Sequence, residues 1–460
     1  MKYLLLISLL SSLLLSRSIT ETRGGTFLNI YSQTNHQSNI VAKVSTRKGE
    51  INKKRCFNTR NNTRWCKITY TANELTLNGY VDEKSLNKIA TNLNYNPTFE
   101  KSYGGRYNEV GNSILPLKDG FLMVGYTQSY GKGHNDIYLM KVDKFGNKIW
   151  SSVYGGTRSD IANAVVAING GFMVAGTTSS FGEGPQSVYL AKITNDGKLV
   201  WQNGYYSDED DYYTGNDMVK ISDNNVMVAG LEDHVSFFNS EVDCYINSIY
   251  TNGKRNGIKR YGGNKMDEAN SIIKTSDGYV FAGVTKTWGN GSEDAYVVKI
   301  DKNGKRVWHN AFGFKQNEVA NQIISTKDGG YIIVGTTDSS RKNMKDIYIV
   351  KITHKGTREW QNHYGSTADE EGFGIVEVNN GYVVTGYTKD TKNYDSNVLL
   401  MKIDKFGSVY WSRRYGGSSD DVGNAIAKVK DGFVVTGYKT AKTSNKDLYM
   451  LKVDENGNIN

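Results

Sequence analysis

Apolar and polar positions along this chain follow one pattern of about fifty residues, which repeats seven times over the last four-fifths of the sequence. Each copy holds four short apolar runs separated by polar turns, which is the size and spacing of β-strands. A fixed period of this length is typical of the blades of a β-propeller. Each copy opens on an aromatic residue, and these residues are Tyr103, Tyr154, Tyr205, Tyr261, Phe312, Tyr364 and Tyr415.

The first copy shows how turn residues divide the four apolar runs. Asp119-Gly120 is a hairpin turn signal, and the glycine of Asp143-Lys-Phe-Gly146 suits a tight turn that needs positive φ. The third copy departs from the pattern, because its loop is longer and Gly257 replaces the usual tryptophan. In the first copy the pattern predicts strands at 110–117, 121–127, 137–142 and 148–153.

The two ends of the array favour a closed ring over an open stack. In five copies a tryptophan stands four residues after the turn glycine, but the last copy has Gly457 and ends at Asn460, without an outer strand. At the other end, Phe99 stands four residues before Tyr103, where later copies have that tryptophan. We therefore expect segment 98–105 to pair with the seventh blade, which removes open sheet edges.

These patterns predict an all-β protein: a seven-bladed β-propeller over residues 99–460, closed by an N-terminal strand and preceded by a small β-barrel. Its repeat resembles an exported bacterial and archaeal propeller family with Tyr-Gly-Gly and Asp-Gly-Gly-Tyr signatures, best matched by Lys327-Asp-Gly-Gly-Tyr-Ile-Ile-Val-Gly335. The resemblance covers residues 99–460 and implies a fold and an exported location, but no particular chemistry.

Residues 25–89 have a different texture, with short alternating runs that predict the small barrel. The runs 25–32, 64–70 and 77–86 resemble the bacterial Src-homology-3-like domain in order and spacing. That resemblance implies attachment to cell-wall peptide or glycan, or to a protein partner. Tyr31, Trp65 and Tyr80 are its candidate binding residues, with a core role as the alternative for Trp65 and Tyr80, and residues 90–98 are the expected linker.

The first residues predict export. Met1-Lys2 is followed by an apolar run over 3–15, too short to span a bilayer, and then by small residues that suit cleavage near residue 18. We expect 1–18 to be a signal peptide and the mature protein to be periplasmic or secreted. No later run is apolar enough for a membrane span.

The three cysteines agree with an oxidising compartment. Cys56 and Cys66 flank a turn-like stretch, and we expect them to form a disulfide. Cys244 stands alone in a strand pattern, which favours a buried, unreactive thiol. The formal charge of +9 is scattered through turns. Since an exported protein rarely meets nucleic acid, this basic surface favours anionic envelope polymers over nucleic acid.

Topology places the crossings between blades and the long loops between second and third strands on one face, which is the candidate binding face. Six residues after each opening aromatic comes an acid. Such acids can form a cation-binding ring at the channel mouth, or hydrogen-bond the crossing backbone, and their strict periodicity favours the second interpretation. The seven acids are Glu109, Asp160, Asp211, Asp267, Glu318, Glu370 and Asp421.

Side chains that break the repeat are the better binding candidates on this face. Exposed aromatic rings can stack on sugars or hold a protein partner, although they can also fold down over neighbouring blades. Basic residues in the later loops can select an anionic partner. The candidates are Tyr130, Phe181, Trp288, Tyr394, Arg341 and Lys342.

The spacing of chemically active residues argues against an enzyme. The six histidines fall at unrelated repeat positions, so no metal cluster and no nucleophile-base pair can be drawn from spacing. We predict an exported, non-enzymatic binding or scaffold protein without a cofactor or metal, whose partner is an envelope protein or a cell-wall glycan or peptide. The alternative is a carbohydrate-active propeller, a lectin or glycan-cleaving enzyme; the acids at 208–210, 232 and 233 are where a catalytic pair would be sought.

Overall fold

A computed structural model describes residues 27–31, 40–45, 50–58, 63–72, 75–84, 98–206, 210–234, 241–339, 344–389, 395–441 and 444–459. The chain divides into two compact units, Met1–Asn96 and Pro97–Asn460. The predicted signal peptide lies outside the described residues. Within the described parts of the chain, the structure has no helix with the length and apolar character of a membrane span.

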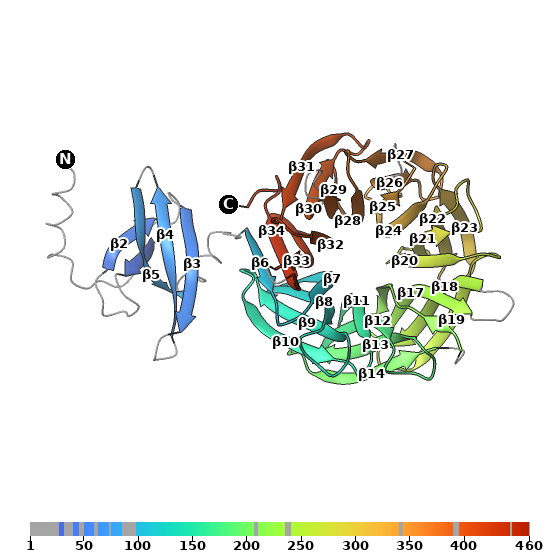
Figure 1. The fold of residues 1–460 in the computed structure, drawn as a ribbon, viewed down its shortest axis with the longest axis horizontal. Coiled ribbons are helices and arrows are strands. Elements are labelled where there is room, and N and C mark those ends of the chain that lie inside the picture. The colour runs from blue at the N-terminus through green and yellow to red at the C-terminus, as the bar shows by residue number, and fades with distance from the viewer. Residues whose placement is uncertain are drawn as a thin grey trace. The chain divides into compact units, whose positions relative to one another are not determined.

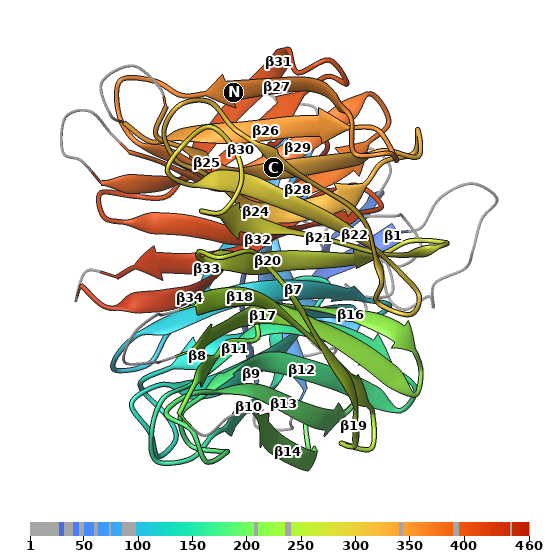
Figure 2. The same ribbon diagram turned by 90° about the vertical axis from the view of Figure 1, so that its right-hand side faces the viewer.

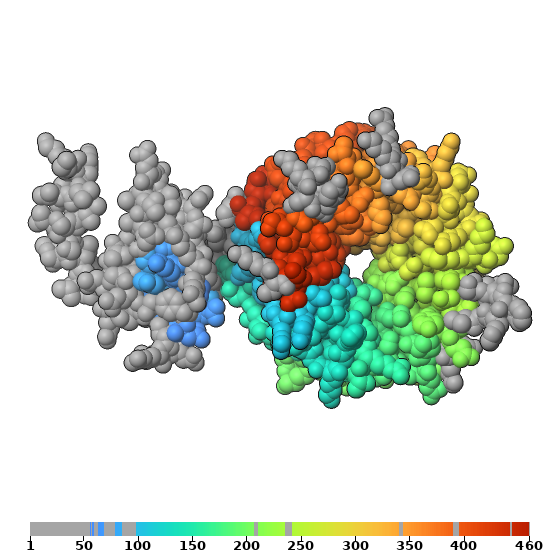
Figure 3. Space-filling view, viewed as in Figure 1, coloured from blue at the N-terminus to red at the C-terminus, as the bar shows by residue number. Residues whose placement is uncertain are grey.

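The second unit is a seven-bladed β-propeller, as the repeat predicts (Figure 1). Figure 2 turns the ring to show its edge, and Figure 3 shows an opening at its centre. Blade one contains β7 (Glu109–Leu117), β8 (Gly120–Thr127), β9 (Asp136–Asp143) and β10 (Lys148–Tyr154), and blade two contains β11 (Asp160–Ile168), β12 (Gly171–Thr178), β13 (Ser187–Thr194) and β14 (Leu199–Tyr205). Blade three contains β15 (Tyr212–Tyr213), β16 (Asp217–Ser222), β17 (Asn225–His234), β18 (Glu241–Tyr250) and β19 (Arg255–Tyr261).

The other four blades repeat the four-stranded plan. Blade four contains β20 (Asp267–Lys274), β21 (Gly278–Thr285), β22 (Asp294–Asp301) and β23 (Arg306–Phe312), and blade five contains β24 (Glu318–Ser325), β25 (Tyr331–Thr337), β26 (Asp346–Ile352) and β27 (Arg358–Tyr364). Blade six contains β28 (Glu370–Val378), β29 (Gly381–Lys389), β30 (Ser396–Ile403) and β31 (Val409–Tyr415). Blade seven contains β32 (Asp421–Val429), β33 (Gly432–Thr440), β34 (Lys446–Val453) and β6 (Phe99–Tyr103).

The ring is closed by β6, which confirms the predicted closure. This strand pairs antiparallel with β34, in a register that runs from Phe99 opposite Lys452 to Tyr103 opposite Leu448. Apolar side chains of blades seven and one then fill the junction, where Val434 packs in one buried cluster with Met123 of blade one. The outermost strand of the last blade thus comes from the start of the propeller, and closure leaves no unpaired end to the array.

The opening tyrosines join neighbouring blades. The Tyr103 hydroxyl donates to the backbone oxygen of Gly146, in the turn before the outer strand of the next blade, over 2.6 Å. Gly146 has φ +71°, and a Cβ there would lie 2.7 Å from the Phe99 ring, so both conformation and space favour glycine. Phe312 has no hydroxyl, and at that junction Asn310 donates to the Gly356 oxygen instead. The same tyrosine contact recurs from Tyr154, Tyr205, Tyr261, Tyr364 and Tyr415.

Asparagines at β-bulges form a second set of bridges nearer the channel. Asn112 is the extra residue of the bulge in β7, and its amide donates to the Ala162 oxygen of blade two over 3.0 Å. The bridge from Asn424 to the Gly111 oxygen joins blade seven to blade one. In blade six the bulged residue is Phe373, which cannot donate. Equivalent bridges start from Asn163, Asn216, Asn270 and Asn321.

The repeated lysine of the third strand and the aspartate of the Asp-Gly turn form ion pairs. Lys299, whose side chain is 3% exposed, lies 2.5 Å from Asp277, and Lys452 lies 3.4 Å from Asp431. A buried ammonium without a partner is costly, and four blades pair this lysine with an aspartate of the same blade. Lys141 with Asp119 and Lys351 with Asp328 complete the set among the described residues.

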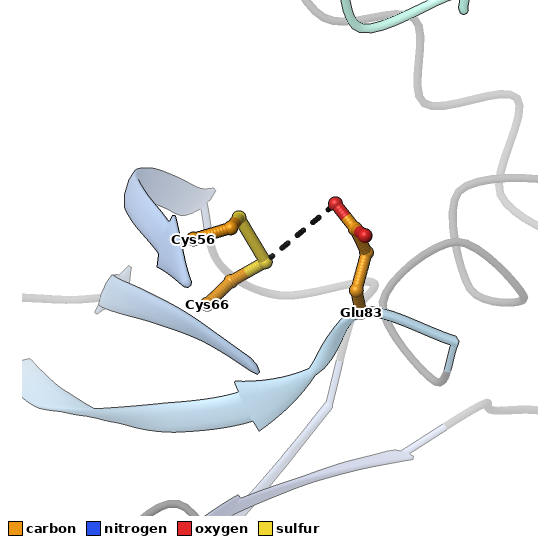
Figure 4. A group of neighbouring side chains, drawn as sticks. All are labelled: Cys56, Cys66 and Glu83. Carbon is orange, nitrogen blue, oxygen red and sulfur yellow. Dashed lines mark hydrogen bonds between the residues drawn. A yellow bond between two sulfur atoms is a disulfide. The ribbon is translucent and has the colours of Figure 1, made fainter. Parts of the chain in front are cut away.

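The N-terminal unit contains one five-stranded antiparallel sheet in the order β2-β1-β5-β4-β3. Cys56 and Cys66 lie opposite each other on β3 and β4 and form the expected disulfide (Figure 4). Trp65 is buried and Tyr80 is half-buried, and the side chain of Tyr31 lies outside the described parts. The likeness to Src-homology-3-like domains stays a prediction. The strands are β1 (Phe27–Tyr31), β2 (Ile40–Ser45), β3 (Glu50–Asn58), β4 (Arg64–Ala72) and β5 (Leu75–Asp82).

Candidate functional site

One face of the ring carries both the crossings between blades and the loops between second and third strands, and we call it the loop face. Backbone bonds show that these segments lie together: the N–H of Gln128 donates to Asn108 of the crossing before it, and the N–H of Asp160 donates to Asn135 of the loop before it, each over 2.8 Å. The Asp-Gly and Asp-x-x-Gly turns lie at the other ends of the strands, on what we call the turn face.

Six of the seven predicted acids are buried and hydrogen-bonded to their own crossing. In blade one, Glu109 accepts the N–H of Gly105 over 2.5 Å and the hydroxyl of Thr127 over 2.8 Å. Each of the six accepts the backbone N–H four residues before it. These carboxylates therefore do not form a ring open to the channel. They hydrogen-bond the crossing backbone, which is the interpretation that their periodicity favoured. The six, all at most 4% exposed, are Glu109, Asp160, Asp267, Glu318, Glu370 and Asp421.

Asp211, the seventh predicted acid, does not occupy the equivalent position, and its assignment from spacing is wrong. In the other blades the acid lies opposite a threonine or lysine of the second strand, but in blade three Tyr213 lies there, opposite Glu232. Tyr213 follows the opening Tyr205 by eight residues, whereas Glu109 follows Tyr103 by six, and these two extra residues shift the count along the chain. Blade three therefore moves its carboxylate from the first strand to the second.

This exchange assembles a group of polar side chains that we call the blade-three cluster: Asp211, Tyr213, Glu232, His234 and Arg260. Nδ1 of His234 lies 2.6 Å from Oδ2 of Asp211, and the Tyr213 hydroxyl donates to Oε1 of Glu232 over 2.8 Å. Arg260 donates from Nη2 to Oε1 of Glu232 over 2.6 Å and from Nε to Oε2. This bidentate pairing raises the pKa of Arg260.

The acidic side chains of the blade-three cluster are buried, and the side chains of His234 and Arg260 are partly exposed. Glu232 is fully buried, whereas the side chains of His234 and Arg260 are 36% and 41% exposed. The cluster therefore presents an imidazole and a guanidinium to a ligand, held in place by carboxylates behind them. Such an arrangement suits hydrogen bonding to a polar or anionic partner. Glu232 is inaccessible, so a ligand at this cluster would meet the side chains of His234 and Arg260 and not the carboxylate of Glu232.

Two groups of side chains in the described residues have metal-ligating atoms close together. Asp211, Glu232 and His234 each offer an atom within 4.8 Å of the others, a donor set compatible with Zn²⁺. Arg260 already holds both oxygens of Glu232, so its positive charge opposes a cation there. The second group is Cys56, Cys66 and Glu83, in which the two sulfur atoms are bonded to each other (Figure 4).

The predicted loop aromatics pack largely on the scaffold. Trp288 stacks on Tyr296 with ring centroids 5.1 Å apart and meets the His309 ring edge-on at 4.6 Å. Burial lowers the pKa of His309, which favours a neutral imidazole in that stack. Phe181 is half-buried, and Tyr130 is 49% exposed. Of these three rings, Tyr130 is the most available to a partner.

Three other predicted site residues, Tyr394, Arg341 and Lys342, lie outside the described residues, as do the acids at 208 and 209. The structure does not bring the described candidates into one pocket-like group: Tyr130, Phe181 and Trp288 belong to blades one, two and four. His234, Arg260 and Tyr213 were missed from the sequence. The sequence feature that could have indicated this cluster is Glu232, an acid at a position where most other blades have threonine.

No known domain family matches the chain. One curated relative, the regulatory protein FlaEY of Caulobacter vibrioides, is 24% identical over 330 residues, which cover 63% of this chain and 34% of that protein. The chain thus spans about a third of the relative's length. Among solved structures, Sqt1 of Chaetomium thermophilum is similar at a TM-score of 0.43 and 12% identity, covering 75% of this chain and 82% of Sqt1. A eukaryotic initiation factor is similar at a TM-score of 0.34 and 10% identity, covering 86% of this chain and 98% of that one.

Proposed function

We propose that this chain is an exported, non-enzymatic binding protein whose loop face, centred on blade three, holds a protein or glycan of the cell envelope. The observation that carries the proposal is the blade-three cluster. Six blades use their acid to hold the crossing, whereas blade three rebuilds this position and exposes His234 and Arg260. Functional residues are usually those that depart from the repeat of a scaffold.

The state of the carboxylates supports binding over catalysis. Most glycan-cleaving enzymes use two carboxyl groups that flank the substrate. On the loop face, the six crossing acids that begin with Glu109 are buried and bonded to backbone N–H groups of their own crossings, and Glu232 is bonded to Arg260. We include a regulatory role in the proposal, because the relative FlaEY is called a regulatory protein.

The disulfide supports the proposed export. Cys56 and Cys66 are bonded in the N-terminal unit, and structural disulfides persist in oxidising compartments. Together with the predicted signal at 1–18, this bond favours the periplasm or the cell exterior. The N-terminal unit is then the proposed attachment to cell-wall peptide, glycan or an envelope protein, on the likeness of residues 25–89 to Src-homology-3-like domains.

Sedimentation with purified cell-wall sacculi tests the proposal. The full chain is expected to pellet with sacculi or to retain a defined envelope protein on a column. His234→Ala with Arg260→Ala should weaken the retention of that envelope protein. The matched control is Val200→Ala, an exposed residue of an outer strand away from the loop face. Turnover of a glycan by the wild-type protein, or equal retention by the variant and the control, contradicts the proposal.

A further inference from the structure

Blade six carries an exposed apolar edge next to the turn face. Phe406 is 68% exposed in the turn between β30 and β31, and Val409 and Tyr410 are 50% and 58% exposed at the start of β31. Tyr410 is the extra residue of a β-bulge, which leaves two consecutive side chains opposite one partner residue. Single exposed apolar side chains are ordinary, but three within five residues form a patch. Figure 1 shows β31 at the rim of the ring.

The other blades show that the scaffold does not need this patch. The turn position of Phe406 is polar in five blades, so nothing in the fold requires an aromatic there. Blade one has the same turn, Asp143-Lys-Phe-Gly146, but there Phe145 is only 8% exposed, and its backbone oxygen accepts the Lys101 ammonium over 2.7 Å. An identical turn is thus covered in one blade and uncovered in another. The polar equivalents are Asp196, Asn252, Asn303, Lys355 and Asn456.

Positive charges of blade six lie around the patch, while the blade-seven turn that contains Asp454 and Glu455 packs against Trp411 and Arg413 beside it. The Lys405 ammonium lies 4.8 Å from the centre of the Phe406 ring, and that of Lys402 lies 5.9 Å from the Tyr410 ring. Arg413 and Arg414 follow on the same strand, and both are exposed. The nearest acid on this strand pair, Asp404, accepts the N–H groups of Phe406 and Ser408, each over 2.8 Å, and these hydrogen bonds lower its pKa.

We propose that this blade-six patch, comprising Phe406, Val409, Tyr410 and the cations around them, docks a partner protein that presents an apolar side chain among carboxylates. The charge of the patch favours acidic partners. It disfavours the protein's own parts: residues 25–89 hold 11 lysines and arginines against 4 acids, and a second copy carries a net charge of +9. Sugars stack on open ring faces, but lysine ammonium groups already lie near both rings.

An array of synthetic peptides tests this surface without knowledge of the natural partner. Each probe has one central phenylalanine or leucine flanked by aspartate and glutamate, and matched probes have serine or lysine in the flanks. The full chain is expected to bind the acidic set at least about tenfold better than the lysine set, and added salt should weaken that binding. Phe406→Ser with Tyr410→Ser should reduce it by about tenfold.

The control is Ile149→Ser with Val200→Ser, since these residues precede the tryptophan of blades one and two as Tyr410 does in blade six, at 50% and 53% exposure. This control should bind the acidic peptides like the wild type, and all variants should keep the same circular dichroism spectrum. The proposal is overturned if Phe406→Ser with Tyr410→Ser binds the acidic peptides as well as the wild type does. It is also overturned if the wild type binds lysine-flanked peptides as well as acidic ones. Binding of heparin with the same dependence on Phe406 also overturns it, in favour of an anionic glycan. The result of this peptide test does not depend on whether the loop face binds a partner.

Discussion

Asn424→Ala removes the hydrogen bond that joins the last blade to the first near the channel. The Asn424 amide donates to the Gly111 oxygen over 3.0 Å, although the two residues are 313 positions apart in the chain. A hydrogen bond of this kind contributes about 0.5–1.5 kcal/mol net, and the buried acceptor left behind adds to the loss. We therefore expect the free energy of unfolding to fall by about 1 kcal/mol, or about fivefold in the folded-to-unfolded ratio.

The size of the propeller decides which assay can detect this loss. With an unfolding entropy of about 2.1 cal/mol/K per residue, a ring of this length would shift its melting temperature by only about 1 °C for 1 kcal/mol. Equilibrium unfolding in guanidinium chloride, followed by tryptophan fluorescence, is therefore the better measurement. Unfolding rates from the same denaturant series show whether the closing junction opens first.

Asn163→Ala is the matched control, because Asn163 donates to the Gly215 oxygen over the same 3.0 Å at a junction inside the array. Both variants break a bridge between blades, and Asn163→Ala also removes the oxygen that accepts the Asn112 amide over 3.2 Å, so it is expected to lose at least as much free energy as Asn424→Ala. If Asn163→Ala is destabilised while Asn424→Ala equals the wild type, blades seven and one are not joined as described. If neither variant changes stability, the asparagine bridges do not stabilise the ring.

Three further predictions concern buried charge and the disulfide. Asp431→Asn should cost about 1–3 kcal/mol in guanidinium unfolding because it leaves the buried Lys452 ammonium unpaired, and adding Lys452→Met should recover most of the loss; no recovery contradicts this reasoning. Burial raises the pKa of Asp217 from 3.8 to about 6, so between these values the folded state keeps a proton that the unfolded state has released. The free energy of unfolding should therefore fall as the pH rises from about 4 to 6. Asp217→Asn should reduce this dependence on pH, and an unchanged dependence refutes the assignment. Cys56→Ser with Cys66→Ser should lower the stability of the N-terminal unit by about 2–4 kcal/mol and leave the propeller transition unchanged, which calorimetry can separate.

The ring could be predicted from the sequence because its signals are local and repeated. Alternation of apolar residues and turn glycines marks each strand, and the observed bounds of β7–β10 lie within one residue of those predicted for blade one. The closing strand was predictable for the same reason, since Phe99 and Tyr103 keep the spacing of an outer strand that the last copy lacks.

The candidate site was less predictable because it depends on register and tertiary contacts. Spacing placed Asp211 with the regular acids, but Tyr213 follows Tyr205 by eight residues where Glu109 follows Tyr103 by six, so Tyr213 takes that position, opposite Glu232. Arg260 lies 28 residues after Glu232, on a different strand, and their pairing leaves no periodic trace. The asparagine bridges depend on bulges, which form only when two strands pair.

Site-specific photo-crosslinking of the full chain in an envelope preparation shows whether the loop face binds a partner. One photoreactive residue replaces Tyr212 beside the blade-three cluster, and another replaces Val200 on an outer strand; the two native side chains are 42% and 53% exposed. We expect a discrete crosslinked species from position 212 and none from position 200. Equal crosslinking from both positions, or from position 200 alone, would contradict it.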